Sequence, residues 1–436
     1  MRFQTAAFHT LGCKVNQYDT QAMRERFEAA GCRTVGFEQA ADVYVVNTCT
    51  VTGTGDRKSL QAIRRCHRQN PDAAIVVCGC LAQRAPQEVK LPGVRLVLGT
   101  QRRGEVVELL ERAMREDCAL VAVQTLQKAP FESLSVRAHE GHTRATMKIQ
   151  EGCDRYCAYC VIPSVRGPIR SRPLCEIREE ARSLAEAGFA ELVLTGIHLT
   201  SYGRDMAEGE TLLDAIAAAH GVDGVRRIRL GSLEPVIVTQ AFVQGLRELP
   251  KVCPQFHLAL QSGSDSVLSR MRRRYTVEEF LRACRLLREA FPDCQLTTDV
   301  MTGFPGETEE EFAQTMQTCR EAGFSRMHVF PYSERAGTKA AEMDGSVPRA
   351  VREERARRLI ALGREMERKA LLARVGREDE VLIEETDAQG RGMGYTRGYL
   401  RAHVPGGAPG ELARVRVTGV EGAELTAESV AKRMGV

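Results

Sequence analysis

The first part of the chain contains short apolar runs that each end at a cysteine or a glycine. Polar, helix-like stretches lie between these runs, most clearly at residues 20–30 and 58–69. Continuous apolar runs of this length are typical of strands that are buried on both faces of a parallel sheet. The pattern therefore predicts a doubly wound α/β domain over residues 1–123. Its strands are expected at residues 43–49, 74–80 and 94–99.

A second series of strand-like segments follows a break in this pattern. Between residues 124 and 144, scattered polar residues, Pro130 and the lack of a clear period indicate a linker. Six strand candidates then follow, spaced about one βα unit apart. A closed parallel barrel would have eight, so we expect a partial (βα)6 barrel over residues 145–348. The strands are expected at residues 146–150, 192–195, 228–230, 257–260, 296–301 and 327–330.

The C-terminal part of the chain changes character again. An arginine-rich stretch at residues 349–372 predicts a connecting helix. From residue 373 to residue 436 the apolar segments are short, bounded by glycine and partly alternating, which is typical of a small all-β barrel. Its strands are expected at residues 381–385, 393–403, 413–417 and 424–430.

Composition limits the function classes that this chain can belong to. Hydrophobic residues make up 43% and charged residues 27%, as in globular proteins with a buried core. A formal net charge of +4 is too small for binding polyanions by overall charge, so any nucleic-acid contact must be local. No apolar run reaches the ~18 residues of a membrane span, and the N-terminus lacks the pattern of a signal peptide. We therefore expect a cytoplasmic protein without a membrane partner.

The chain has 15 cysteines, which is unusual for a protein of a reducing compartment. Cys153, Cys157 and Cys160 follow the first expected barrel strand at spacings of four and three residues. Three thiolates in one loop can bind three corners of an iron–sulfur cube and leave the fourth iron open. A zinc site and simple burial are the alternatives, although structural zinc prefers four ligands.

A second group of cysteines is dispersed in the sequence. Cys13, Cys49 and Cys80 each end an expected strand, and the carboxyl ends of parallel strands lie along one edge of a sheet. Three such thiolates can converge, whereas any one of them alone would be expected simply to be buried. Cys78 competes with Cys80 on the same strand, and the position at the strand end favours Cys80.

The CxxxCxxC loop after the first strand of a partial barrel resembles the radical S-adenosylmethionine (SAM) enzymes. Further motifs resemble the methylthiotransferases of that group, and the resemblance covers essentially the whole chain. Stretches 11–20, 56–59 and 330–333 are most similar to the branch that modifies N6-threonylcarbamoyladenosine just 3′ of the tRNA anticodon. The family motifs are LGCKVNQ at 11–17, NTCTVT at 47–52, GCLAQ at 79–83, GPIRSR at 167–172, LQSGSD at 260–265 and TDVMTGFPGE at 298–307.

The resemblance implies a radical enzyme that inserts a methylthio group at C2 of this adenosine in the anticodon loop. The C2 hydrogen has no useful acidity, so a cofactor-borne radical is the plausible route. SAM would be used twice, once to methylate a sulfide and once as the source of a 5′-deoxyadenosyl radical. A reductase or other electron donor, a sulfur donor and a TRAM-like C-terminal barrel are also implied.

The resemblance further implies two [4Fe–4S] clusters, and it also favours Cys80 over Cys78. The sulfide would be held at the first cluster and the radical generated at the second, so all six ligands count as catalytic. The ligands of the first cluster would be Cys13, Cys49 and Cys80, and those of the second Cys153, Cys157 and Cys160.

Residues at successive strand ends are candidates for binding SAM. A glycine at a strand end lets bare backbone approach the methionine amino group, and polar side chains there can bond to the ribose. Tyr159 and Val329 could flank the adenine. Arg166 and Arg170 follow the cluster loop and could neutralise a carboxylate or phosphate. The strand-end candidates are Thr195, Gly196, Ser232, Glu234, Gln261 and Asp299.

Candidate RNA contacts are local. Two basic runs, at residues 270–275 and 226–229, could bind phosphates, although solvated helix ends give the same pattern. In the C-terminal barrel, Tyr395 and Tyr399 alternate with arginines along one expected strand. Aromatic side chains in such a position can stack on unpaired bases.

Two kinds of alternative remain open. A non-catalytic iron–sulfur protein that binds RNA or senses redox state would explain the cysteines, but it would leave the open irons and the polar strand ends without a role. Within the enzyme class, the target could instead be isopentenyladenosine in tRNA or an aspartate of a ribosomal protein. Mass spectrometry of tRNA nucleosides separates these possibilities.

Overall fold

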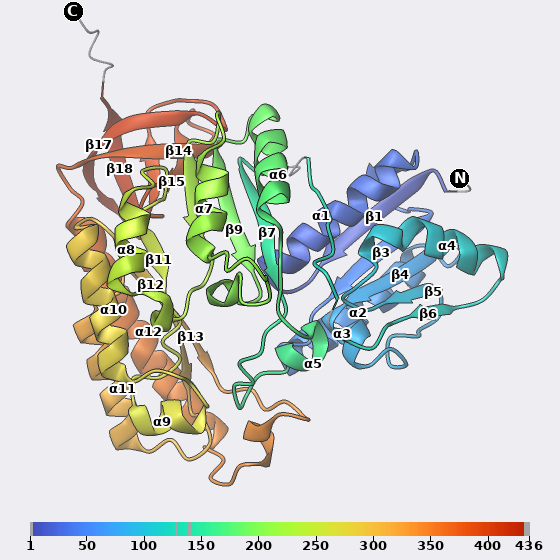
Figure 1. Cartoon of the computed structure of the whole chain (residues 1–436), viewed down its shortest axis with the longest axis horizontal. Coiled ribbons are helices and arrows are strands. Elements are labelled where there is room, and N and C mark those ends of the chain that lie inside the picture. Colours follow the sequence, from blue (N-terminus) through green and yellow to red (C-terminus); the bar gives the residue numbers. More distant parts are fainter. Residues whose placement is uncertain (1–2, 128, 138–140, 431–436) are drawn as a thin grey trace, which may run out of the picture.

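The computed structural model describes residues 3–127, 129–137 and 141–430 (Figure 1). An α/β sheet domain is followed by a central half-open barrel and then by a small closed β barrel. The predicted fold class is confirmed in all three parts. Residues 431–436, which the prediction assigned to the last barrel, lie outside the described residues.

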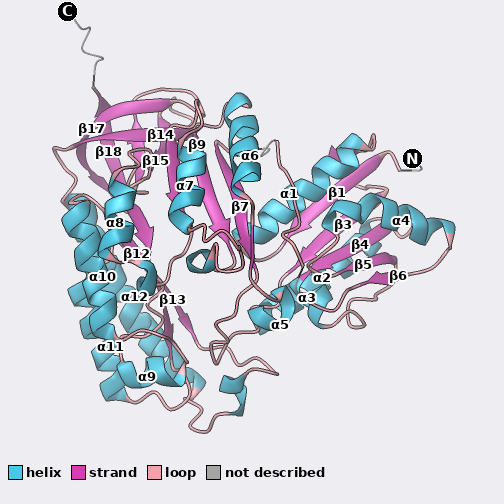
Figure 2. Cartoon of the chain, in the orientation of Figure 1, coloured by secondary structure: helices cyan, strands magenta, loops and turns pink. Residues whose placement is uncertain are grey.

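The N-terminal domain is a parallel sheet with the strand order β2-β1-β3-β4-β5-β6. From β1 the chain moves first to one neighbour, β2, and then to the other, β3, so the topological switch point lies between β1 and β3. Helices cover both faces of the sheet (Figure 2). The strands are β1 (Thr5–Thr10), β2 (Arg33–Val35), β3 (Val43–Thr48), β4 (Ala74–Gly79), β5 (Val94–Leu98) and β6 (Leu120–Ala122), and the helices are α1 (Lys14–Ala29), α2 (Gly53–Gln69), α3 (Cys80–Arg84) and α4 (Val106–Arg115).

Two apolar layers hold these helices on the sheet. One layer contains Phe27 of α1 and Leu110 of α4, and the other contains Ile63 of α2 and Leu81 of α3. The described residues between β6 and the next strand, β7, form no helix or strand. In this segment Leu134 packs against α1, which holds the segment on the first domain.

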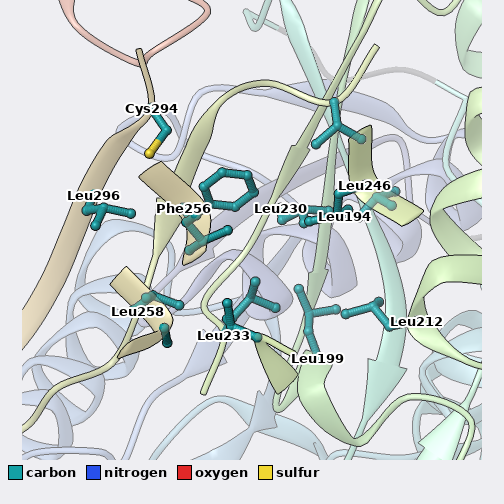
Figure 3. Packing of buried hydrophobic residues seen from close by; sticks show 14 of the residues in the cluster. Leu194, Leu199, Leu212, Leu230, Leu233, Leu246, Phe256, Leu258, Cys294 and Leu296 are labelled. Atoms are coloured by element: carbon teal, nitrogen blue, oxygen red, sulfur yellow. The ribbon is translucent and has the colours of Figure 1, made fainter. Parts of the chain in front are cut away.

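The central domain has six parallel strands in two hydrogen-bonded groups, β10-β9-β7-β8 and β11-β12-β13, in which only the two-residue β8 runs antiparallel. Isolated bridges Ile228–Val252 and Leu233–Leu258 join the groups. Leucines and Phe256 fill the layer between strands and helices (Figure 3). The strands are β7 (Arg144–Glu151), β8 (Arg170–Ser171), β9 (Glu191–Gly196), β10 (Arg227–Leu230), β11 (Gln255–His257), β12 (Gln295–Thr302) and β13 (Arg326–Pro331).

The helices of this domain lie outside the strands, and three of them begin with a capping box. Thr211, Thr276 and Thr308 each accept a hydrogen bond from a backbone N–H of the first turn, while an acidic residue three positions later bonds back. This arrangement satisfies two backbone donors and fixes where each helix begins. The helices are α5 (Ile162–Arg166), α6 (Leu174–Glu186), α7 (Leu212–His220), α8 (Gln240–Arg247), α9 (Asp265–Arg270), α10 (Val277–Ala290) and α11 (Glu309–Ala322).

Helix α12 (Arg349–Leu372) leads to a closed barrel with the strand order β14-β15-β16-β18-β17. The prediction of a single strand over 393–403 was wrong, because a turn containing Tyr399, at φ 66°, divides it. The prediction of a strand at 257–260 was displaced, since β11 ends at His257. The barrel strands are β14 (Glu378–Thr386), β15 (Gly392–Thr396), β16 (Arg401–Val404), β17 (Leu412–Glu421) and β18 (Glu424–Ser429).

Buried ion pairs attach this small barrel to the central domain. Arg229 of β10 pairs with Glu191 at 2.7 Å and donates to the carbonyl of Arg397 at 3.1 Å. Arg227 pairs with Glu380 of β14 at 2.9 Å. Both arginines are buried, so this part of the second basic run is structural and does not present phosphate contacts.

The two tyrosines predicted to stack on bases lie at the same interface. Tyr395 and Tyr399 stack on each other with ring centroids 4.5 Å apart, and the guanidinium of Arg144 lies 5.0 Å from each ring. They come from a strand and from the turn after it, so the prediction that they alternate along one strand was wrong. In the described part of the chain, no helix has the length and apolar character needed to cross a membrane.

Candidate functional site

Three cysteines of the first domain meet at one sheet edge. Cys13 caps α1 directly after β1, Cys49 follows β3, and Cys80 is the first residue of α3 after β4. These strands are neighbours, so the three thiols converge beside the switch point. A Cβ added to Gly12 would lie 3.1 Å from the Sγ of Cys49. Burial is the main cause that raises the pKa of Cys49 and Cys80, the latter to about 11, and the neighbouring thiols add to the shift.

Cys78 faces away from this group. Its Sγ lies 3.7 Å from the carbonyl oxygen of Val46, inside the apolar layer under α1 and α4. Gly79, at φ 91°, follows it, and a Cβ there would lie 2.3 Å from the side-chain oxygen of Asn47. Only glycine fits this turn, which directs Cys80 to the sheet edge. The structure therefore brings Cys80, and not Cys78, beside Cys13 and Cys49.

The second group of cysteines lies in the loop after β7. The Cys153 amide donates to the carbonyl of Gly167 at 3.0 Å, and the Cys160 amide donates to that of Cys157 at 3.0 Å. Burial raises the pKa of Cys153 to about 11 and that of Cys160 to about 12, and the other thiols of the loop contribute. The three thiols thus lie close together. Arg273 donates to the Sγ of Cys157 at 3.3 Å.

Each group of thiols fits an iron–sulfur cluster. Each offers three sulfur donors, and in each an arginine is hydrogen-bonded to one sulfur, because Arg166 donates to the Sγ of Cys80 at 3.3 Å as Arg273 does to Cys157. A nearby guanidinium favours the thiolate that iron binds. Among the described residues, no three His, Cys, Asp or Glu side chains are grouped as ligands of one metal ion.

Arg166 stands in a buried network of charges between the first two domains. Its Nη1 lies 3.0 Å from Glu151 of β7 and 3.1 Å from Asp19 of α1. Lys148 pairs with Asp19 at 2.6 Å, and Arg103 pairs with both carboxylates. These cations lower the pKa of Glu151 although burial acts in the opposite direction. Arg166 was predicted to neutralise a carboxylate or phosphate. In the structure it pairs with the carboxylates of Asp19 and Glu151, which belong to the protein and not to a ligand.

Arg170 and Glu234, two further candidates, also bond within the protein. Arg170 donates to the carbonyl oxygen of Arg166 at 2.7 Å. Glu234 lies 2.9 Å from Arg155, 2.9 Å from Arg273 and 3.1 Å from His198. Burial would raise the pKa of Glu234, but these partners lower it to about 2. Glu234 thus positions two arginines around the Cys153 loop.

Three other predicted cofactor residues, Asp299, Gln261 and Tyr159, also bond to or pack against the protein. Asp299 bonds to His257 and to His328, each at 3.3 Å, and these contacts lower its pKa against the effect of burial. Gln261, at φ 63°, exchanges backbone hydrogen bonds with β12. Tyr159 is half-buried and packs edge-on against Phe304.

A cavity of about 460 Å³ connects the first thiol group to the barrel. Cys13 lies at its wall, opposite the ends of β9 and β10, and the predicted residues Thr195, Gly196 and Ser232 line it. The other predicted cofactor residues are not part of its described lining: Tyr159, Glu234, Gln261, Asp299 and Val329. The volume is that of a typical small-molecule site.

The cavity also contains basic residues that sequence reasoning did not select. Lys14 directly follows Cys13, which is the signal that could have identified it. The other basic lining residues lie inside or next to strands and gave no such signal. They are His257, Arg326 and His328, and Arg229 of the second basic run lines the cavity as well. Burial and the nearby arginines lower the pKa of Lys14.

Some residues of the first basic run, 270–275, bond to other parts of the protein, and others are exposed to solvent. Arg270 pairs with Glu311 at 2.7 Å, and Tyr275 donates to the carbonyl oxygen of Leu260 at 2.8 Å. Arg272 and Arg274 are exposed. These two arginines, and the exposed Arg226 of the second run, stay candidates for phosphate contact.

Three family models match this chain. Residues 5–99 match the uncharacterized protein family UPF0004, residues 147–319 match the radical SAM superfamily, and residues 372–430 match the TRAM domain. Radical SAM enzymes use SAM together with a [4Fe–4S] cluster, and the loop 153–160 lies inside the matched segment. The structure of the radical SAM methyltransferase TsrM from Kitasatospora setae is similar in fold, with a TM-score of 0.57 and 17% identity over 78% of this chain and 77% of that one.

Relatives with assigned activities match nearly the whole sequence. The threonylcarbamoyladenosine tRNA methylthiotransferase MtaB of Bacillus subtilis is 43% identical over 95% of this chain and 93% of its own length. The MtaB of Aquifex aeolicus is 38% identical over 87% and 92%. The tRNA-2-methylthio-N(6)-dimethylallyladenosine synthase of Thermobifida fusca is 36% identical over 98% and 89%. Taken with the radical SAM match, these identities place the chain in the family of the MtaB-type radical SAM methylthiotransferases.

Proposed function

We propose that this protein inserts a methylthio group at C2 of N6-threonylcarbamoyladenosine, just 3′ of the anticodon of tRNA. One observation carries the proposal. A single cavity joins Cys13 of the first thiol group to the ends of β9 and β10 in the radical SAM barrel, so a base bound there would lie between the two domains. The MtaB names of the relatives at 35–43% identity support the choice of base.

We further propose two [4Fe–4S] clusters, one on each thiol group. Cys13, Cys49 and Cys80 would hold the first, and the loop at 153–160 the second. With SAM, the clusters supply methyl transfer to sulfur and a carbon-centred radical. The residues of the chain itself would position the reactants. Arg166 donates to a sulfur of the first group and Arg273 to one of the second, and Gly196 lies at the cavity wall, where Gln150 leaves no room for a side chain.

The described surfaces also indicate how tRNA would bind. An anticodon-loop base is unpaired, so it can enter a cavity without the opening of a duplex. Arg272 and Arg274 are exposed, and Arg273 between them donates to Cys157 of the Cys153 loop. These two exposed arginines would bind phosphates of the anticodon loop. We infer that a reductase supplies electrons and that a separate donor supplies sulfur.

The decisive test is mass spectrometry of tRNA nucleosides from a strain that lacks the gene. We expect the 2-methylthio form of threonylcarbamoyladenosine to disappear and its precursor to accumulate. Loss of the 2-methylthio form of isopentenyladenosine instead would favour the activity named for the Thermobifida fusca relative. No change in any tRNA nucleoside would favour a ribosomal-protein target or the non-catalytic alternative.

A second test addresses the two clusters. After anaerobic reconstitution the wild-type protein should bind about eight irons, and the triple variant Cys153→Ala, Cys157→Ala, Cys160→Ala about half of these. Replacement of Cys13, Cys49 and Cys80 should also halve the iron but should leave cleavage of SAM to 5′-deoxyadenosine intact. Complete loss of iron from either triple variant would contradict separate clusters.

A further inference from the structure

The cavity beside Cys13 is lined by basic side chains, with no acidic residue among the described lining. Lys14, Arg229 and Arg326 contribute to its wall, and so do two histidines. A cavity with this lining favours a ligand that carries negative charge.

Two of the cations have no counter-charge of their own. Arg229 is neutralised by Glu191 at 2.7 and 3.2 Å, and the histidines share Asp299. In the described part of the chain, the side chains of Lys14 and Arg326 have neither a hydrogen bond nor an ion pair. Both residues are solvent-accessible, so an oxyanion that enters the cavity reaches two cations that are not already bonded to protein atoms.

Lys14 also lies next to the first thiol group, where the methylthio group would be assembled. It is the residue next to Cys13, and its side chain lines both this cavity and a neighbouring one of about 300 Å³ that also contains Arg144. In an adenine, C2 and the N6 substituent lie on the same edge of the ring, separated by N1. A base whose C2 approaches the Cys13 group therefore brings its N6 substituent within reach of the neighbouring lysine.

We propose that Lys14 binds the carboxylate of the threonylcarbamoyl group and so determines which adenosine the enzyme accepts. The inference rests on the proposed function. An isopentenyl group has no charge to offer and would leave Lys14 unpaired, whereas a carboxylate forms a charge-assisted hydrogen bond with it. Arg326, on the same wall, is the second cation available to the same group.

The test measures binding of tRNA to the reconstituted holoenzyme, with two matched ligands. One is tRNA bearing threonylcarbamoyladenosine, and the other is the same tRNA with that carboxylate converted to a methylamide. Wild-type protein should bind the carboxylate form roughly tenfold more tightly. Lys14→Met should lose this preference by weakening only the carboxylate form, Lys14→Arg should retain it, and Lys90→Met, at an exposed lysine outside the cavity, should change nothing.

Each other outcome overturns the inference in a recognisable way. Equal weakening of both tRNAs by Lys14→Met would mean that Lys14 binds a phosphate, and weaker binding of SAM alone would assign it to the cofactor's carboxylate. No change at all would remove Lys14 from the site. If Lys14→Met failed to retain iron, equal binding of the two tRNAs by wild-type protein would still refute the inference, and retention of the preference by Lys14→Arg would still support it. Failure of the proposed function would show separately, as absence of methylthiolation by the wild-type enzyme.

Discussion

Cys78 and Cys80 provide a matched pair of substitutions within one strand end. Both side chains are buried, with 0% and 3% exposure, and they differ in the side of the sheet that they face. Replacing either by alanine removes one sulfur atom from a packed environment. By the usual cost of deleting one buried group, each variant should lose roughly 1 kcal/mol in the free energy of unfolding of the iron-free protein.

The two variants should differ sharply in iron content. Cys80→Ala should retain about four irons per chain, because the first thiol group loses a ligand, and Cys78→Ala should retain about eight. Iron analysis and visible absorbance after reconstitution measure this, and urea unfolding of the iron-free proteins measures the stability. Cys66→Ala, at another fully buried thiol, is the control for the packing cost. Iron lost from Cys78→Ala but kept in Cys80→Ala would refute the assignment of the strand end.

Three further substitutions test the ionic interactions. Arg166→Met should lower the free energy of unfolding by about 3 to 5 kcal/mol, because buried carboxylates lose a cation; a loss below about 1 kcal/mol in urea would contradict this. Glu191→Gln should cost a similar amount by leaving Arg229 unpaired, and limited proteolysis should then release the C-terminal barrel more readily than in wild type. The Arg270 contact lowers the pKa of Glu311 to about 2, so its stabilisation is complete above pH ~4.5 and disappears as the pH falls toward 2. Between pH 6 and pH 3, wild type should lose about 1 to 2 kcal/mol more than Glu311→Gln, and parallel curves would contradict the ion pair.

Apolar runs predicted the fold well where burial alone determines it. The expected strands at 43–49 and 74–80 match β3 and β4, whose residues are all buried. Strands β2 and β6 have three residues each and are only partly buried, so they gave no comparable signal. The interruption of 393–403 depends on a left-handed residue, Tyr399, whose conformation is fixed by tertiary contacts and not by its side-chain type.

The candidate site was predictable in its thiols but not in its charges. Cysteine spacing and strand ends identified two groups of three, and the structure brings each group together. Buried cations such as Arg166, Lys148 and Arg229 cannot be distinguished from solvated ones in a sequence, because their partners are brought to them only by the fold. Glu234 and Asp299 were selected as free strand-end polar groups, yet Glu234 is already bonded to arginines and Asp299 to histidines.

The charges between the first two domains have a consequence for catalysis. Arg103 and Asp19 belong to the sheet domain, whereas Lys148, Glu151 and Arg166 belong to the barrel, and all five are almost completely buried. Opening this interface would separate paired charges at a cost of several kcal/mol. The sheet edge that carries Cys13, Cys49 and Cys80 is therefore held at a fixed position relative to the barrel. In the proposed reaction the RNA base would therefore move into a fixed site, with no movement of one domain relative to the other.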